Sequence, residues 1–254
     1  MIFKKFLLIT FFPLGLFSAV ADIYPALDDW QEAVVYNNQG LQMESMGKPE
    51  EAAQYYEKAI AADPTLAIAY SNRGNLYYVQ KNFNKAADYF KKAIRLKPET
   101  AAFHINLANV FYAEKRFDKA IEEYQIALEL DPNNAVAECN LGDTYLCKGS
   151  LELARHHLER ATTLNPEHAL GHYNLGRLYL AEKNWVQAKK CFKRSLELNP
   201  NYPDVHFQLA KLYEDEYNTA LALQHYVAYL KLDPKGEKVR EAVERIRRLR
   251  SQAP

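Results

Sequence analysis

Apolar residues recur along most of the chain at steps of three and four, a spacing typical of amphipathic helices. Two segments between residues 101 and 130 show it clearly, "AAFHINLANVFYAEK" and "FDKAIEEYQIALEL". A polar break at Lys115–Arg116 separates them. The second segment ends at Asp131–Pro132, because proline disfavours helical geometry in the residue before it and lacks an N–H. The pattern predicts two helices joined by a short turn.

The same pattern returns every 34 residues, with no insertion between units. The prolines that end each unit are Pro64, Pro98, Pro132, Pro166, Pro200 and Pro234. An alanine column keeps the same step at Ala52, Ala86, Ala120, Ala154, Ala188 and Ala222. Six such periods predict a repeat architecture, in which stacking buries apolar faces that one pair of helices cannot bury alone.

Three further columns suggest how the helices pack. A small residue recurs at Gly40, Gly74, Ala108, Gly142, Gly176 and Ala210. Large residues recur at Met43, Tyr77, Phe111, Tyr145, Tyr179 and Tyr213, and at Tyr56, Phe90, Tyr124, Leu158, Phe192 and Tyr226. We expect the small residues to let paired helices approach closely, and the large ones to fill the space between neighbouring pairs.

These columns resemble the tetratricopeptide repeat family, whose 34-residue pattern has an aromatic residue, then Leu-Gly, Tyr, Ala, Phe and Pro. The third unit carries "HINLANVFY", Ala120, Tyr124 and Pro132, and the fifth carries "HYNLGRLYL", Ala188, Phe192 and Pro200. The resemblance implies an all-α, right-handed α-solenoid of six helix-turn-helix repeats with a C-terminal capping helix. Two departures lie in the sixth unit, where Tyr229 replaces a small residue and "EDEYNTA" replaces the usual turn.

The period sets the expected boundaries of the repeats. They are 33–66, 67–100, 101–134, 135–168, 169–202 and 203–236, after a lead-in at 22–32. Residues 237–254 form the expected capping helix and tail. An apolar stripe runs through Val239, Ala242, Val243, Ile246 and Leu249, and the opposite face is basic.

The first 21 residues have a different composition from the repeats. Lys4 and Lys5 precede an apolar run from Phe6 to Phe17, and the small residues Ala19 and Ala21 follow. This is the pattern of a secretory signal peptide cleaved after Ala21. It predicts an exported protein, in a bacterial periplasm, with a membrane anchor over residues 6–20 as the alternative. The run is short for a spanning helix, which needs about 20 residues.

Composition and motifs exclude several classes of function. Lysine plus arginine equals aspartate plus glutamate at 32 each, so no basic excess indicates nucleic acid binding. No phosphate-binding glycine loop, His-Glu-x-x-His motif or nucleophile elbow occurs, so we expect neither an enzyme nor a cofactor. Cys139, Cys147 and Cys191 are expected to be thiols packed as small apolar groups.

One polar column is the main candidate for function. It consists of Asn38, Asn72, Asn106, Asn140, Asn174 and Gln208, in the middle of each first helix. Asparagine is a poor helix former, so helical propensity does not explain the column. A side-chain amide offers a donor and an acceptor, as does each residue of an extended peptide backbone. Repeats spaced by about 10 Å would offer one amide per three peptide residues. The column is therefore a candidate peptide clamp, and an idle solvated column is the alternative.

The neighbours of this column suggest an apolar, amide-rich groove. Val34, Ile68, Ala102, Val136 and Leu170 lie one turn before it, and Asn75, Asn109, Asp143, Arg177 and Lys211 lie one turn after it. Members of the family that bind acidic chaperone tails use a lysine and arginine clamp. Asn37, Ala102 and Asn106 occupy those positions here, so we do not expect that mode of recognition.

The histidines are expected to be structural. His104, His172 and His206 share the first aromatic column and should pack, hydrogen-bonded, at helix contacts. His157, Cys191 and His225 are zinc-type ligands in one column. Their repeats are about 10 Å apart, whereas zinc binds its ligands at about 2.0–2.3 Å. No metal site is therefore predicted.

The resemblance implies binding of other proteins. We expect extended peptide segments of partners to lie in the groove, in envelope assembly or secretion. Two alternatives stay open, a structural scaffold that docks folded partners on its convex face and a non-catalytic subunit of a larger complex. Contact of the basic terminal helix with a membrane also stays open. The sequence sets no oligomeric state.

Overall fold

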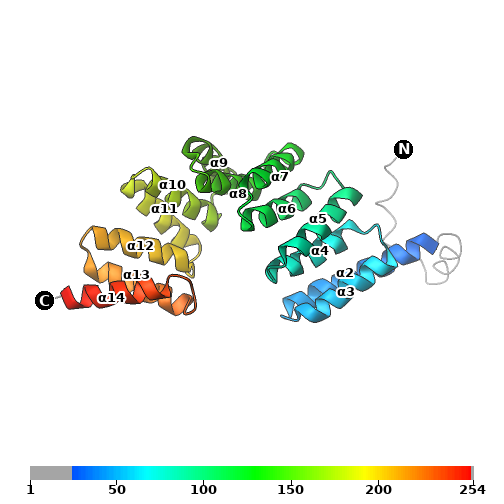
Figure 1. Ribbon diagram of the computed structural model, residues 1–254, viewed down its shortest axis with the longest axis horizontal. Coiled ribbons are helices and arrows are strands. Elements are labelled where there is room, and N and C mark those ends of the chain that lie inside the picture. Colours follow the sequence, from blue (N-terminus) through cyan, green and yellow to red (C-terminus); the bar gives the residue numbers. More distant parts are fainter. Residues whose placement is uncertain (1–24, 253–254) are drawn as a thin grey trace. The chain divides into compact units, whose positions relative to one another are not determined.

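The computed structural model describes residues 25–252, and every secondary-structure element there is an α-helix (Figure 1). The expected signal peptide, residues 1–21, lies outside the described residues. The first three pairs are α2 (Pro25–Ser45) with α3 (Pro49–Ala62), α4 (Ala67–Val79) with α5 (Phe83–Leu96), and α6 (Ala101–Ala113) with α7 (Phe117–Leu130). The next three are α8 (Ala135–Cys147) with α9 (Leu151–Leu164), α10 (Ala169–Ala181) with α11 (Trp185–Leu198), and α12 (Pro203–Asp215) with α13 (Thr219–Leu232). A last helix, α14 (Val239–Gln252), follows.

The chain forms two compact units that divide inside α6, one up to Val110 and one from Phe111 onward. In the first unit, α2 packs on α3, α3 on α4, and α4 on α5. In the second unit, the pairs α8–α9, α10–α11 and α12–α13 pack on one another in sequence order, and α14 packs on α13. This is the paired helix-turn-helix arrangement that the sequence predicts.

The first helix begins earlier than expected. Helix α2 starts at Pro25, inside the segment 22–32 that we expected to precede the first repeat. Proline is favoured in the first turn of a helix, where its missing N–H has no partner to lose. No further proline or glycine follows until Gly40, so nothing in the chain stops the helix from starting there.

The turn inside each repeat is built the same way in all six described pairs. A residue with positive φ follows the first helix, at Gly47, Lys81, Lys115, Gly149, Lys183 and Tyr217. In the second pair, the Lys81 N–H donates to the Tyr78 carbonyl and the Asn82 N–H donates to the Tyr77 carbonyl, both at 2.9 Å. These two bonds define a Schellman motif, which ends a helix in the left-handed conformation. The divergent sixth turn has the same geometry, with Tyr217 at φ 56°.

The small column lets the two helices of a pair approach closely, as predicted. A Cβ added to Gly40 would lie 2.4 Å from Cε1 of Tyr56, and one added to Gly176 would lie 2.5 Å from Cε1 of Phe192. Tyr56 and Phe192 belong to the second helix of the same repeat. The second large column therefore fills the inside of its own pair, and our expectation that it fills the space between pairs was wrong for these contacts.

Helix α14 covers the last repeat. Ala242, Ile246 and Leu249 of the predicted stripe are buried in one core with residues of α12 and α13. The unusual Tyr229 is 1% exposed, and its hydroxyl accepts a hydrogen bond from the Lys238 N–H at 3.1 Å. The residue that departs from the repeat pattern thus fixes the chain just before the capping helix.

The basic face of α14 is partly neutralised. Arg245 lies 3.3 Å from Glu214 of α12, and Arg248 also pairs with Glu214. Burial opposes ionisation of Glu214, but a hydrogen bond from Tyr226 and the two arginines outweigh it and hold the pKa of that carboxyl below its usual value. Within the described residues, no helix is long and apolar enough to cross a membrane.

Candidate functional site

Three asparagines of the column bond to the repeat before them. In the first unit, the Asn72 amide donates to the Asn37 side-chain oxygen at 2.9 Å, and the Asn106 amide donates to the Ser71 hydroxyl at 3.2 Å. In the second unit, the Asn174 amide donates to the Cys139 sulfur at 3.6 Å. Each partner lies 35 residues earlier, one position before the column in the preceding repeat. Neither expectation for this column, peptide clamp or idle amide, included this role.

Burial differs along the column. Asn72 and Asn174 are 8% and 2% exposed, respectively, Asn106, Asn140 and Gln208 are half-buried, and Asn38 in the first repeat is exposed. The Asn140 carbonyl accepts a hydrogen bond from the Thr144 hydroxyl at 2.7 Å. Gln208 forms a hydrogen bond with Tyr173, which again lies 35 residues earlier. Burial raises the pKa of Tyr173 to about 12, and the bond to Gln208 lowers that pKa.

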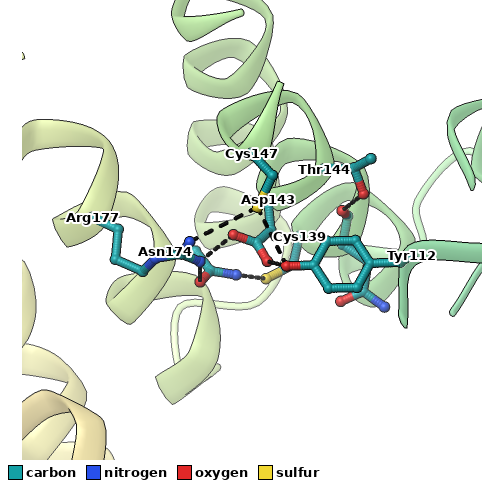
Figure 2. Close-up of polar contacts among 8 residues, drawn as sticks. Tyr112, Cys139, Asp143, Thr144, Cys147, Asn174 and Arg177 are labelled. Carbon is teal, nitrogen blue, oxygen red and sulfur yellow. Dashed lines mark hydrogen bonds and ion pairs between the residues drawn. The ribbon is translucent and has the colours of Figure 1, made fainter. Parts of the chain in front are cut away.

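A polar network continues from the column in the second unit (Figure 2). Arg177 of α10 pairs with Asp143 of α8, and the Tyr112 hydroxyl donates to Asp143 at 2.6 Å. Arg177 also donates to the Asn174 side-chain oxygen at 3.1 Å. Burial opposes the charge on Arg177, but Asp143 favours it more strongly, so the pKa of Arg177 lies above its usual value. Asp143 and Arg177, which we expected to place charge in this part of the groove, therefore pair with each other inside the protein.

The cysteines do not all pack as expected. Cys139 and Cys191 are buried free thiols, whereas Cys147 is exposed. Cys147 lies at the edge of the same network, with its sulfur 3.4 Å from the Tyr112 hydroxyl (Figure 2). Burial raises the pKa of the Cys139 thiol to about 12, so Cys139 acts as a neutral acceptor for Asn174.

The histidines of the first aromatic column are structural, as predicted. Nε2 of His104, His172 and His206 lies 2.9–3.1 Å from the carbonyl of the proline six residues earlier. The fourth repeat has Glu138 at this position, a carboxylate that cannot donate. Arg160 takes over, donating to the Pro132 carbonyl at 2.7 Å while its Nε lies 3.1 Å from Glu138.

The three residues of the candidate zinc column, His157, Cys191 and His225, have different surroundings. His157 Nδ1 lies 2.6 Å from Glu138, and His225 Nδ1 lies 2.9 Å from His206. Cys191 is buried. Among the residues that the structure describes, no three histidine, cysteine, aspartate or glutamate side chains are grouped so as to hold a metal ion.

The apolar neighbours of the column differ in their exposure. Ile68 is 43% exposed and Val136 is 46% exposed, while Val34 and Leu170 are half-buried and Ala102 is exposed. The sequence did not indicate the row of acceptors at Asn37, Ser71 and Cys139, because these acceptors differ in chemical type and Ile105 and Phe207 stand in the same column.

The successive pairs of helices define an all-α repeat protein. Comparison with known proteins identifies its family. Tetratricopeptide repeat models match residues 44–99, 72–135, 139–168, 169–202 and 191–224. The chain belongs to the tetratricopeptide repeat family. It is a scaffold for protein–protein interaction, in a family that is typically non-catalytic. A search of curated proteins gives no match.

Solved structures share the fold. The structure of Pseudomonas aeruginosa PilF is 30% identical over 75% of this chain and 90% of its own, with a TM-score of 0.61. PilW, described as a widely conserved type IV pilus biogenesis factor, is 19% identical over 83% and 98%, with a TM-score of 0.73. YrrB, described as having an unusual peptide-binding site, is 27% identical over 72% and 92%, with a TM-score of 0.52.

Proposed function

We propose that this protein is an exported scaffold that binds extended segments of partner proteins along the first helices of its repeats. The observation that carries the proposal is the row of exposed apolar side chains beside the asparagine column. Ile68 and Val136 occupy the same place in their repeats and are each more than two-fifths exposed. Their burial by a ligand would be favourable by about 25 cal/mol for each Å² of apolar surface.

The asparagines would contribute orientation as well as hydrogen bonds. A side-chain amide has two donor hydrogens and an acceptor oxygen, and the bond to Asn37 occupies one donor of Asn72. That bond also fixes the side chain before a ligand arrives. A fixed side chain loses less conformational entropy on binding, so the remaining groups of the amide bind more effectively.

The proposed location and process rest on the N-terminal pattern. A basic start, an apolar run and Ala19–Ala21 support export with cleavage after Ala21. An exported scaffold would act in envelope assembly or secretion. PilW is a type IV pilus biogenesis factor, but the likeness to PilW concerns the fold, and the proposal does not depend on it.

The test uses photo-crosslinking in the native compartment. A benzophenone amino acid replaces Ile68 or Val136 on the first helices, or Tyr55 on a second helix, one at a time. We expect partners to crosslink from Ile68 and Val136 and not from Tyr55. Ile68→Ser and Val136→Ser should together weaken capture about tenfold or more. They should lower the melting temperature only slightly, because Ile68 is 43% exposed and Val136 is 46% exposed.

The asparagines need a matched control, because Asn72→Ala also removes a bond between repeats. Asn37→Ala removes that bond from the other side and leaves the Asn72 amide in place. Both variants should lower the melting temperature, and Asn72→Ala should weaken binding more than Asn37→Ala, which removes only the orienting bond. Equal loss of binding in both would limit the column to a structural role. Crosslinking from Tyr55 alone would favour docking on the convex face.

A further inference from the structure

We propose that the turns inside the fifth and sixth repeats form an edge that binds an anionic lipid surface. This turn edge consists of Trp185 and Val186 at the start of α11, Tyr217 in the turn after α12, and the basic residues beside them. The proposal is independent of the peptide groove, which runs along the first helices. It rests on the exposure of three apolar side chains, on their common position, and on the unpaired charge around them.

The turn edge carries the three most exposed large apolar residues among the described residues of the second unit. Trp185 is 51% exposed, Val186 is 73% exposed and Tyr217 is 93% exposed. Neither Val186 nor Tyr217 has a large apolar counterpart in another repeat, so the fold does not require one at either place. The place of Val186 holds Glu50, Asn84, Asp118, Glu152 and Ala220, and the place of Tyr217 holds Gly47, Lys81, Lys115, Gly149 and Lys183.

An ion pair shows that the three residues lie together. Lys189 of α11 pairs with Glu216, the residue before Tyr217. Trp185 precedes Lys189 by one helical turn, so it lies on the side of α11 that faces the turn of the sixth repeat. Side chains on a helix lean towards its N-terminus. Because Trp185 and Val186 are the first two residues of α11, they point outward from this end of the repeat, beside Tyr217.

The unpaired charge at the turn edge is mostly positive. Lys183 and Lys190 are exposed and have no ion pair among the described residues. The end of α14 adds positive charge beside Tyr217, because Arg248 and Tyr217 line the same cavity. Residues 246–252 of α14 include three arginines and no acidic residue. The acidic residues of the two turns that form ion pairs are Glu182, Glu214 and Glu216, and the one that forms none is Asp215. The edge therefore favours an anionic partner.

A lipid surface fits this edge better than a folded protein does. The apolar side chains protrude, so a protein partner would need a matching pocket for each, whereas the headgroup region of a membrane accommodates protruding apolar groups. Tryptophan and tyrosine are enriched where a membrane meets water, because their rings combine an apolar body with a polar group. Each lysine or arginine close to an anionic membrane strengthens binding about fivefold.

Vesicle binding by the chain from Asp22 onward tests the proposal. That chain contains every helix that the structure describes, and it lacks the apolar run from Phe6 to Phe17, which would itself bind lipid. We expect it to sediment with vesicles made of equal parts of phosphatidylcholine and phosphatidylglycerol, and about tenfold less with phosphatidylcholine alone. Trp30→Phe leaves Trp185 as the only tryptophan. Its fluorescence should shift to shorter wavelength when the anionic vesicles are added.

Variants separate the apolar contact from the charge. Val186→Asn combined with Tyr217→Gly copies residues that other repeats have at these places, so the chain should fold, and it should bind the anionic vesicles about tenfold more weakly. Lys183→Gln combined with Lys190→Gln should weaken binding at low salt and have little effect at high salt, where exposed charges are screened. Ile126→Asn removes an exposed apolar side chain of α7 outside the turn edge, and this control should bind like wild type.

Four results would overturn the proposal. The first is a wild-type chain that binds neither kind of vesicle, and the second is a folded Val186→Asn, Tyr217→Gly chain that binds as strongly as wild type. Unchanged Trp185 fluorescence in a bound chain would place the lipid contact elsewhere. Loss of partner capture in the double variant, without vesicle binding by wild type, would assign the edge to a protein partner.

Discussion

Lys81, Lys115, Lys183 and Tyr217 adopt a backbone conformation that disfavours residues with a side chain. Their φ angles lie between 56° and 59°, where the Cβ atom approaches the following carbonyl oxygen. The equivalent turns at Gly47 and Gly149 carry glycine, which avoids this cost. The helical turn geometry is therefore imposed by the rest of the repeat, and local sequence preference opposes it at four of the six described turns.

Exchanging residues at this position should change stability in opposite directions. We expect Lys183→Gly to raise the free energy of unfolding by about 0.5–1 kcal/mol, and Gly149→Lys to lower it by about 1 kcal/mol. Urea unfolding followed by circular dichroism measures both. Lys183→Ala keeps a Cβ and should bring no gain. Stabilisation by Lys183→Ala equal to that by glycine would show that the lysine side chain, not the backbone, is the cause.

Single residues also show the limit of sequence reasoning about the site. The 34-residue step places the asparagines at the same position of each first helix. Their hydrogen bonds run to residues 35 positions earlier, Asn37, Ser71 and Cys139. Those partners differ in chemical type, so no column of identical residues indicates them. Asp143 and Arg177 likewise share one column, and only the packing of α8 against α10 shows that they pair.

Two helices of the sixth repeat meet through a pair of histidines. His225 of α13 lies against His206 of α12 and stacks on Tyr213 at 5.5 Å between ring centroids. Burial lowers the pKa of His225 to about 4, and the charges of His206 and Lys193 act in the same direction. At neutral pH this contact therefore contains a neutral His225.

The contact should make the second unit sensitive to mild acid. His225 is neutral in the folded state and takes up a proton near pH 6.5 when unfolded, so the unfolded state binds more protons between pH 6.5 and about 4. Stability contributed by the neutral form is present above pH 6.5 and is lost as the pH falls towards 4. We expect a loss on the order of 1–2 kcal/mol, reduced for partial exposure.

Thermal melts at pH 7 and pH 4.5 measure this loss. The control is His225→Tyr, since Tyr55 and Tyr89 occupy the same column. The variant should lose less stability between the two pH values than wild type. An equal loss in both would assign the pH dependence to carboxylates elsewhere and exclude His225.

The elements themselves were predictable because the period repeats six times without a gap. Each expected pair of helices is present, and the apolar stripe of α14 packs as its spacing predicts. The start of α2 at Pro25 was not predicted, because the sequence before the first repeat has no preceding unit with which to compare it. The contact of Tyr56 with Gly40 was assigned to the wrong gap, since a column fixes a helix face but not which neighbour meets it.

At the scale of the whole molecule, two successive interfaces between repeats are equivalent. Arg155 of α9 pairs with Glu182 at the end of α10, and Lys189 of α11 pairs with Glu216 after α12. Both pairs join residues 27 positions apart, and each member of the second pair lies 34 positions after its counterpart in the first. The same electrostatic contact therefore closes two successive joints.

This equivalence makes the protein divisible by repeats. Excision of residues 169–202 would place α9 against α12, and Arg155 would then face Glu216 in place of Glu182. We expect the shortened chain to fold cooperatively, with reduced stability because one interface is lost. Excision of only 17 residues from the same place should leave an unfolded segment. Circular dichroism and limited proteolysis distinguish these results, and equal damage by both excisions would contradict them. In that case, the number of whole repeats would set the length of the partner segment that the proposed scaffold can hold.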